Sequence, residues 1–409
     1  MPPSDSGSRL GLWLIGARGA IATCVAYGLA GLRAGLVKPI GLCTEVEPFD
    51  RLDLAPLGDF VLGGHDVCRR DLSASAAELV RTSVLTSDLV TGTAQDASAY
   101  EARIRPGMLD GPDVGVSDLD PRAAELGSAS PREQIDHVMQ DLAAFREESG
   151  VERVIVVNVA STEAWREEQP EWGDLAAFEK ALDDARPQPA SSLYAYAALR
   201  SGHPYVNFTP SRGAALPALR QLALDLGVPH CGNDGKTGET LVKTALAPMF
   251  TARALRVLSW QGYNMLGNRD GEVLADRAHK EAKLRNKDAA LRSILGDDAT
   301  HTHVGIDYVP SLQDWKTAWD FIHFEGFLGA RMSLSFTWSA SDSALAAPLV
   351  IDLARLSDLA QRSGEAGEMS HTASFFKDPI GGGSHDFHAQ FRDLLAYAVG
   401  HKGRRGGRS

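Results

Sequence analysis

A strand, a glycine-containing turn and a helix of small residues follow one another near the start of the chain. Leu10–Ile15 (LGLWLI) is apolar throughout and is predicted to be a buried strand, and residues 24–32 are predicted to be helical. The connection begins with Gly16, Ala17, Arg18, Gly19, Ala20 and Ile21. This is an imperfect form of the glycine fingerprint of dinucleotide-binding βαβ units, because Arg18 replaces the middle glycine and Ala22 the last. The alternative is an ordinary tight turn, but the position directly after a strand favours a turn that holds the phosphates of a dinucleotide.

Further apolar runs end in polar residues, as strands of a parallel sheet do at the edge where ligands bind. Predicted strands cover residues 40–43, 60–66, 154–157 and 205–208, and residues 191–199 are predicted to be a helix. Glu45 or Glu47, after the run at 40–43, would bind the adenosine ribose hydroxyls and favour NAD over NADP. Asn158, Ser161 and Thr209 are predicted to line a cofactor crevice, although side chains of these types also cap helices.

The strand pattern changes after Phe250. Residues 256–260, 304–308 and 332–338 resemble antiparallel strands, and residues 280–294 and 315–321 are predicted to be helical. A long helix at 344–362 is predicted to return to the first sheet, residues 105–133 form an exposed connection, and a final helix precedes a basic tail. We therefore expect an α/β fold. A Rossmann-like NAD-binding domain of residues 1–240, completed by 345–409, is interrupted by an α+β domain of residues 241–344.

Composition excludes several classes of protein. The net charge of −12 argues against a general nucleic-acid or anionic-membrane binder. No stretch of about 18 apolar residues predicts a membrane span, and residues 1–9 do not resemble a signal peptide. The four cysteines form neither a disulfide framework nor a metal-binding spacing, and the histidines show no convincing metal set. We expect a cytoplasmic protein, without a metal site built from its own residues, that binds an anionic substrate in a local basic pocket.

Lysine is concentrated in the part of the chain where such a pocket is expected. Seven of the ten lysines lie between residues 236 and 377, whereas only 9 of 31 arginines do. Gly232-Asn233-Asp234-Gly235 is a turn signal, and Lys236-Thr237-Gly238-Glu239-Thr240 then leads into an apolar helical pattern. The free N–H groups at such a helix start bind anions, and lysine supplies a compact, titratable amine. The alternative is a chance cluster on a solvated face.

Five blocks in this region and beyond it carry a family resemblance. They are GNDGKTGETLVKTALAPMF, GYNMLGNRDGEVL, KLRNKD, DYVPSLQDWKTAWDFIHFEG and LAAPLVIDL. In this order they resemble the inositol-3-phosphate synthase family, also called inositol-1-phosphate synthase, in its shorter prokaryotic form. The resemblance covers nearly the whole chain from Gly16 to Lys377, and it is weakest at the glycine turn.

The resemblance implies an isomerase that converts glucose 6-phosphate to inositol phosphate. In this family a tightly bound NAD is regenerated in each turnover: C5 is oxidised, C6 attacks the C1 aldehyde, and C5 is reduced again. The resemblance also implies a homotetramer that acts on a sugar phosphate and has no nucleic-acid or membrane partner. Some members use a divalent or monovalent cation near the cofactor phosphates, and the sequence leaves that requirement open.

The matching blocks also imply roles for individual residues. Asp234 would hold the nicotinamide carboxamide. The substrate phosphate would lie on Thr237, Gly238, Glu239 and Thr240 and would be bound by Lys287 and Lys316. Because the family often has an uncharged residue at the position of Glu239, we expect that residue to contact phosphate only through its backbone N–H.

The remaining roles concern the reacting sugar. Lys283 and Lys377 would transfer protons and stabilise oxyanions, and Asn268 and Asp270 would face substrate hydroxyls. Asp352 would orient a lysine, or would instead pair with Arg355 or Arg331. Two other functions stay open: the same reaction cycle on another sugar phosphate, such as a ketohexose phosphate, and a non-catalytic NAD-binding sensor. Asn286, where the family more often has serine, leaves room for the first, and the intact lysine set argues against the second.

Overall fold

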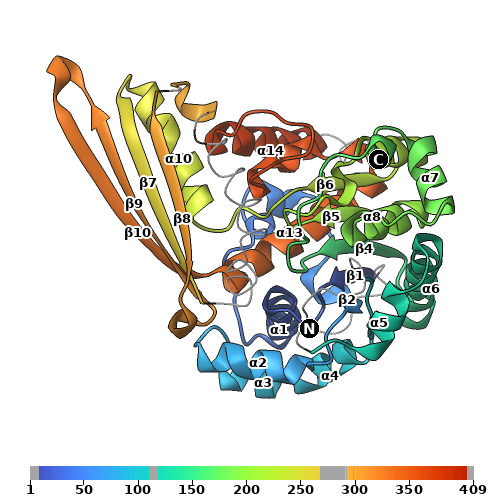
Figure 1. Cartoon of the computed structure of the whole chain (residues 1–409). Coiled ribbons are helices and arrows are strands. Elements are labelled where there is room, and N and C mark those ends of the chain that lie inside the picture. Colours follow the sequence, from blue (N-terminus) through green and yellow to red (C-terminus); the bar gives the residue numbers. More distant parts are fainter. Residues whose placement is uncertain (1–8, 110–117, 268–290, 292, 298, 403–409) are drawn as a thin grey trace. The chain divides into compact units, whose positions relative to one another are not determined.

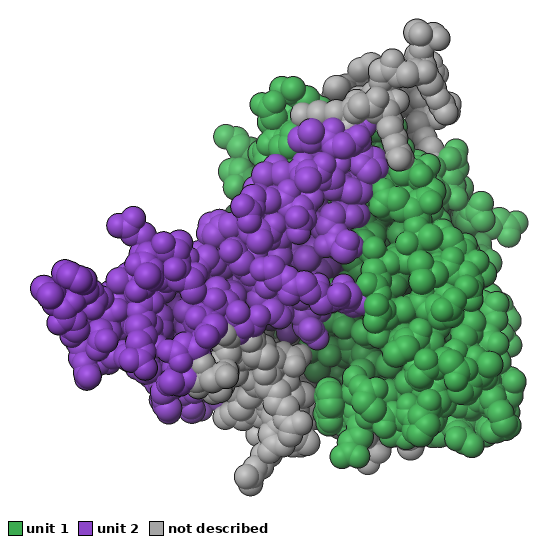
Figure 2. All heavy atoms as spheres, turned by 90° about the horizontal axis from the view of Figure 1, so that it is seen from above, with its two compact units in different colours: residues 1–233, 347–369 green, residues 234–346, 370–409 purple. Residues whose placement is uncertain are grey.

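The chain is divided into two compact units. The structure, a computed structural model, describes residues 9–109, 118–267, 291, 293–297 and 299–402. Unit 1 consists of Met1–Asn233 and Ala347–Met369, and unit 2 of Asp234–Ala346 and Ser370–Ser409 (Figure 2). The division therefore falls at Asn233, earlier than the residue 240 expected from sequence. Only residues 347–369 return to unit 1, whereas residues 370–409, expected to complete the first domain, group with unit 2.

Unit 1 contains a seven-stranded parallel sheet with the order β11-β6-β5-β4-β1-β2-β3 (Figure 1). Its strands are β1 (Leu10–Ile15), β2 (Phe60–Asp66), β3 (Ile104–Pro106), β4 (Arg153–Asn158), β5 (Tyr205–Asn207), β6 (Pro229–Gly232) and β11 (Gly367–Glu368). Every residue of β1 and β2 is buried, as expected for central strands covered on both faces. The strand order reverses between β1 and β4, and in such sheets this is where a dinucleotide binds. The expected Rossmann-like α/β fold is thus confirmed.

Helices surround this sheet. They are α1 (Ala20–Ala34), α2 (Leu72–Arg81), α3 (Ser87–Gly92), α4 (Ala94–Glu101), α5 (Pro121–Gly127), α6 (Pro131–Ser149), α7 (Leu175–Asp183), α8 (Ala190–Arg200) and α9 (Pro217–Leu226). One continuous apolar cluster joins α6, α7, α8 and α9 to β1, β4 and β5. On α1, small residues permit close packing, and this helix contacts α2, α3 and α4. This packing fixes the turn between β1 and α1.

Two sequence-based predictions in unit 1 are wrong. Residues 40–43 do not form the second strand: Ile40 is 84% exposed, and a short 3-10 helix, Cys43–Glu45, follows. The second strand along the chain is β2, which the sequence analysis counted as the third strand. In addition, the described part of residues 105–133 is not simply an exposed connection, because it includes α5 and the start of α6, each with a proline in its first turn.

Unit 2 is built around a four-stranded sheet with the order β10-β9-β7-β8. Its strands are β7 (Arg256–Leu266), β8 (His301–Tyr308), β9 (Trp315–Glu325) and β10 (Arg331–Ser341). Strand β9 is antiparallel to both β10 and β7, whereas β7 and β8 are parallel, which the expected antiparallel pattern did not include. Helix α10 (Glu239–Ala252) packs on one face, where Phe250 and Trp260 belong to the same apolar cluster.

The prediction of a helix at residues 315–321 is wrong. In β9 the side chains alternate, with Lys316, Ala318, Asp320 and Ile322 buried and Trp315 and Trp319 exposed. This period of two is the pattern of a strand. The helix predicted at 280–294 lies almost entirely outside the described residues. The two long helices near the C-terminus are α13 (Asp342–Arg362), which runs from unit 2 into unit 1, and α14 (Phe387–Lys402). None of the described helices is both long and apolar enough to cross a membrane.

Candidate functional site

The turn between β1 and α1 is fixed by the end of β2. Gly16 has φ +86°, and a Cβ placed on it would lie 2.7 Å from Cα of Ala160, so glycine is required there. The amides of Gly16 and Ala17 donate to the carbonyl of His65 at 2.9 and 3.0 Å. The amide of Arg18 donates to Asp66 Oδ2 at 2.7 Å. Three successive N–H groups of the turn are therefore used inside the protein rather than offered to a ligand.

The start of α1 is suited to phosphate. Gly19 is its N-cap residue and supplies no side-chain cap, and no acidic residue lies in the first turn. The first-turn N–H groups, which include those of Ala20 and Ile21, point out of the helix end and carry its positive dipole. With the small side chains and the reversal of strand order at β1, these groups fit the pyrophosphate of a dinucleotide.

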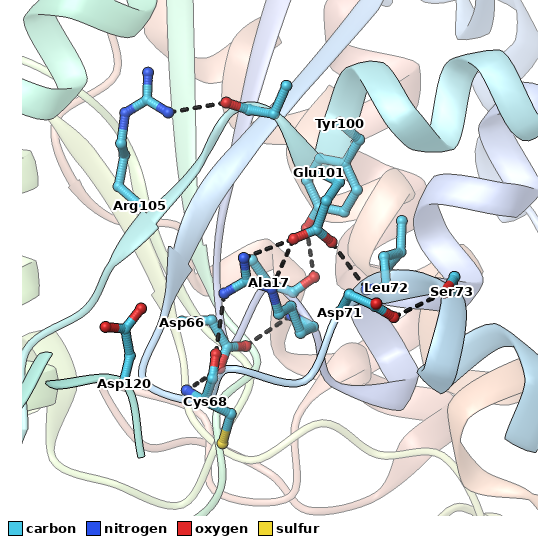
Figure 3. Close-up of polar contacts among 12 residues, drawn as sticks. Ala17, Asp66, Cys68, Asp71, Leu72, Ser73, Tyr100, Glu101, Arg105 and Asp120 are labelled. Atoms are coloured by element: carbon cyan, nitrogen blue, oxygen red, sulfur yellow. Dashed lines mark hydrogen bonds and ion pairs between the residues drawn. The ribbon is translucent and has the colours of Figure 1, made fainter. Parts of the chain in front are cut away.

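Asp66 is a candidate cofactor residue that the sequence analysis missed. It is the last residue of β2, the place where a Rossmann fold carries the carboxylate for the adenosine ribose. Its Oδ1 also accepts the amide of Cys68 at 2.8 Å, and Figure 3 shows it beside Ala17. Burial raises the pKa of Asp66, while the N–H donors oppose that rise. Of the two glutamates considered for this role, Glu45 pairs with Arg355 and Glu47 pairs with Arg51. The wrong strand prediction at residues 40–43 made β2 the third predicted strand. The carboxylate at the end of β2 was therefore not considered as the ligand of the adenosine ribose.

Polar residues at the ends of β4, β5 and β6 form one buried network. Asn158 donates to Asn207 Oδ1 and Thr209 Oγ1 at 3.3 and 3.4 Å, and Asn207 donates to Asn233 Oδ1 at 2.9 Å. Thr209 Oγ1 also donates to Asn207 at 2.8 Å. Ser161, in the loop after β4, is exposed. The carboxyl edge of this sheet therefore presents a rigid amide and hydroxyl surface, with Asn158 and Thr209 among its members.

In unit 2, two chain segments pair around Asp234. This residue has φ +62°, a left-handed conformation that Asp tolerates better than most residues. Its carbonyl accepts the amide of Lys377 at 2.7 Å, its Oδ1 accepts Lys377 Nζ at 2.8 Å, and the amide of Lys236 donates to Phe375. Lys236 Nζ donates to Gln390 at 2.6 Å. Burial, and then the charge of Lys377, lower the pKa of Lys236 to about 8.

The start of α10 lies beside a second lysine and its carboxylate. Gly238 is the N-cap residue and supplies no side-chain cap. Thr237 Oγ1 donates to Asp342 Oδ1 at 3.2 Å, and Lys316 Nζ donates to Asp342 Oδ2 at 3.3 Å. Although burial raises it, the pKa of Asp342 is lowered overall by Lys316 and then Lys377. Burial opposes the charge of Lys316, but Asp342 and then Glu239 raise its pKa overall. Both groups are therefore held charged.

Asp342, rather than Asp352, is the aspartate that pairs with Lys316. Asp352 belongs to unit 1, where it accepts the amides of Cys43 and Thr44 at 2.8 and 3.2 Å and the hydroxyl of Thr44 at 2.5 Å. No described lysine is among its partners, and Arg355 binds Thr44 and Glu45 instead. Within the described residues the carboxylate of Asp352 holds Cys43 and Thr44, and its expected role beside a lysine stays a prediction.

The carboxylate of Glu239 is directed into the interior of unit 2. Its Oε1 lies 2.5 Å from Lys243 Nζ, which also lies 3.2 Å from Asp320 Oδ1. Trp260 Nε1 donates to the same oxygen of Asp320 at 2.7 Å. Burial raises the pKa of Asp320 to about 6. All three ionisable side chains are nearly inaccessible to solvent. The arrangement is consistent with a Glu239 that presents only its backbone N–H at the helix start, while Thr240 next to it is also buried.

Four predicted site residues lie outside the described residues: Asn268, Asp270, Lys283 and Lys287. Within the described chain, no group of three or more His, Cys, Asp or Glu side chains is arranged to hold a metal ion. Trp338 is a further residue that sequence analysis missed. Its buried indole N–H has no hydrogen-bond acceptor among the described residues, and it lies 3.4 Å from where a Cβ on Gly238 would be. The start of α10 thus has an unused neutral donor next to it.

Comparison with known proteins gives a consistent result. A family model described as Myo-inositol-1-phosphate synthase matches residues 10–397. Inositol-3-phosphate synthase 1 of Bacteroides thetaiotaomicron is 34% identical over 404 residues, covering 93% of this chain and 91% of that protein. Inositol-3-phosphate synthase isozyme 2 of Arabidopsis thaliana is 31% identical. That match covers 74% of this chain but only 60% of the plant protein.

Solved structures share the fold. Inositol-3-phosphate synthase of Caenorhabditis elegans has a TM-score of 0.85 at 23% identity, covering 97% of this chain and 86% of the other. A myo-inositol-1-phosphate synthase-related protein of Thermotoga maritima has a TM-score of 0.76 at 23% identity, covering 96% and 98%. At this level of identity the structural likeness establishes the fold alone.

Proposed function

This chain belongs to the myo-inositol-1-phosphate synthase family, and from that premise we propose that it cyclises glucose 6-phosphate to inositol phosphate with NAD as its cofactor. The observation that carries the proposal is the paired set of charges at the start of α10. There Lys316, Asp342 and Thr237 surround a helix end without a side-chain cap. The helix dipole, the free N–H groups and the Lys316 ammonium would stabilise a phosphate dianion there, against the repulsion of the Asp342 carboxylate, which Lys316 partly neutralises.

In unit 1, Ala20 and Ile21 would donate N–H groups to the pyrophosphate of the cofactor, and Asp66 would accept the adenosine ribose hydroxyls. The family resemblance assigns the nicotinamide carboxamide to Asp234. When bound, NAD accepts a hydride from C5 of the sugar and later returns it, so that the sugar is oxidised only temporarily. The buried network of Asn158 and Thr209 keeps the edge of the sheet rigid beneath it.

The phosphate end of the substrate would be held in unit 2. Lys316 supplies charge, and the N–H groups of Glu239 and Thr240 supply directed donors. The unused indole N–H of Trp338 gives one more donor beside Gly238. Lys243 matters here because its ion pair with Glu239 keeps that carboxylate away from the phosphate. A carboxylate facing a dianion would otherwise repel it.

Lys377 would act on the charge that develops during the reaction. Its ammonium, positioned by Asp234 at 2.8 Å, can stabilise an oxyanion on the sugar when C5 is a ketone and C6 attacks C1. Lys236 is buried nearby with a lowered pKa, so a fraction of it is neutral near neutral pH. A neutral amine can accept the proton that leaves the C5 hydroxyl. Lys283, which the resemblance assigns to proton transfer, lies outside the described residues.

The sheet of unit 2 would join subunits into a homotetramer. The face opposite α10 exposes large apolar side chains: Tyr263, Trp315 and Trp319 are 40%, 39% and 41% exposed. Tyr263 and Trp319 stack with ring centroids 6.2 Å apart. An exposed apolar sheet face of this kind is typical of an interface between copies of a chain.

Product analysis tests the proposed function. The purified chain, with NAD and glucose 6-phosphate, should release inositol phosphate without net accumulation of reduced cofactor, followed at 340 nm. Reduced cofactor that rises in proportion to product would show an ordinary dehydrogenase. A carbocycle formed from a ketohexose phosphate, but not from glucose 6-phosphate, would show the same cycle on a different substrate. Binding of NAD without turnover of either sugar would favour a sensor.

A further inference from the structure

Arg18 occupies the position where the dinucleotide fingerprint usually has a glycine, and a carboxylate holds its guanidinium. Nε and Nη2 donate to Glu101 Oε1 at 3.0 and 2.6 Å, and Nη1 donates to the carbonyl of Cys68 at 3.0 Å. The other oxygen of Glu101 accepts the amide of Leu72 at 2.9 Å (Figure 3). Both carboxylate oxygens are therefore occupied, and the direction of the guanidinium is fixed.

This ion pair lies next to the acid that ends β2. The amide of Arg18 donates to Asp66, and Cys68, which accepts from its guanidinium, follows Asp66 by two residues. In dinucleotide-binding folds this place faces the adenosine ribose. A carboxylate there selects NAD, whereas an arginine there accommodates the 2′-phosphate of NADP. This chain carries both groups, so its preference depends on how much positive charge Arg18 can offer.

The surrounding charges oppose a phosphate. Besides Asp66 and Glu101, two more carboxylates interact with Arg18. The pKa of Asp71 is lowered first by the amide of Ala74, and that of Asp120 first by Arg122, and Arg18 lowers both further. Figure 3 labels the carboxylates of Asp66, Asp71, Glu101 and Asp120 in one close-up. An arginine compensated by several carboxylates offers little net attraction to a 2′-phosphate.

We propose that the Glu101–Arg18 ion pair determines the cofactor preference of this chain. Glu101 neutralises and holds an arginine that could otherwise bind the 2′-phosphate, and the turn therefore takes NAD and discriminates against NADP. The inference rests on the proposed function in one respect: it requires that NAD binds at the turn between β1 and α1. It assigns to Glu101, at the end of α4, a role in specificity rather than in catalysis.

Calorimetric titration of the full-length chain with NAD and with NADP tests this without any turnover. The wild type should bind NAD more tightly. Glu101→Gln should lower the ratio of Kd for NADP to Kd for NAD by about tenfold, because one negative charge next to the 2′ position is lost. Glu179→Gln is the matched control. Glu179 is also a partly exposed partner of an arginine, Arg200, but lies on α7, and its loss should leave the ratio unchanged.

A second variant changes the ratio in the opposite direction. Arg18→Gln removes the cation and leaves Glu101 and Asp66 uncompensated, so the same ratio should rise, and this result is available even if Glu101→Gln fails to fold. A ratio unchanged in both variants, with NAD still bound, overturns the inference and leaves the proposed function intact. A wild-type chain that binds neither dinucleotide overturns both.

Discussion

Asp342 balances the charge at the start of α10, because it accepts hydrogen bonds from both Lys316 and Thr237. Asp342→Asn should lower kcat/KM for glucose 6-phosphate by at least about tenfold, since Lys316 loses the partner that positions it. The measurement is inositol phosphate formation over a range of substrate concentrations. Asp342→Glu, which keeps the charge, should recover part of the loss. Activity of Asp342→Asn equal to the wild type would show that this carboxylate does not position Lys316.

Asp352→Asn provides the contrast, because its carboxylate accepts three hydrogen bonds within unit 1. An amide NH2 in that place would face N–H donors, so the variant should lose stability rather than turnover per folded molecule. The sequence pointed to Asp352 because it lies in LAAPLVIDL, one of the five blocks that carry the family resemblance. Which carboxylate pairs with a lysine depends on the distance between them in the folded chain. Asp342 is identified by the structure, in which Lys316 of β9 lies beside it.

Among the helices and strands, those predicted correctly were the ones whose apolar residues by themselves show the period of a helix or of a strand. Strand β1, α8 and the long helix α13 are examples. Strand β9 was taken for a helix because lysine and aspartate occupy its inward positions, Lys316 and Asp320, where a strand usually has apolar residues. These buried charges are stable because Asp342 and Lys243 pair with them. The misassigned strand therefore coincides with the candidate site.

Gly262 on β7 leaves space for that buried charge cluster. A Cβ on Gly262 would lie 2.5 Å from Lys243 Nζ, 2.6 Å from Glu239 Oε1 and 3.0 Å from Asp320 Oδ1. Gly262→Ala should therefore destabilise the chain by roughly 1–3 kcal/mol, the usual cost of overpacking a filled interior. Thermal melts measure it. Gly400→Ala, on α14 with nothing within 4 Å of the new Cβ, is the control and should not lower the melting temperature. Equal melting temperatures for both variants would contradict the tight packing.

At the scale of the whole molecule, sequence patterns predicted a Rossmann-like part and a second α+β part, and both are present. The sequence patterns could not assign residues 370–409 to the correct unit. These residues group with unit 2, where α14 packs on α10 and on the 3-10 helix Ser370–Phe375. That grouping depends on contacts between segments more than a hundred residues apart, such as Lys236 with Gln390. Periodicity describes each segment by itself and contains no information about such pairings.

We expect the exposed aromatic face of the unit 2 sheet to form the interface between subunits. Trp319→Glu places a charge in the middle of the stacked rings of Tyr263, Trp319 and Phe321, where a subunit interface would have to desolvate it. The variant should therefore dissociate a tetramer into smaller species, measured as molar mass by light scattering after size exclusion at micromolar concentration. Val399→Glu, at a residue of α14 that is 60% exposed, is the control and should leave the mass unchanged. A wild-type chain that is monomeric under these conditions, or a Trp319→Glu variant with the wild-type mass, would show that this face is not the interface.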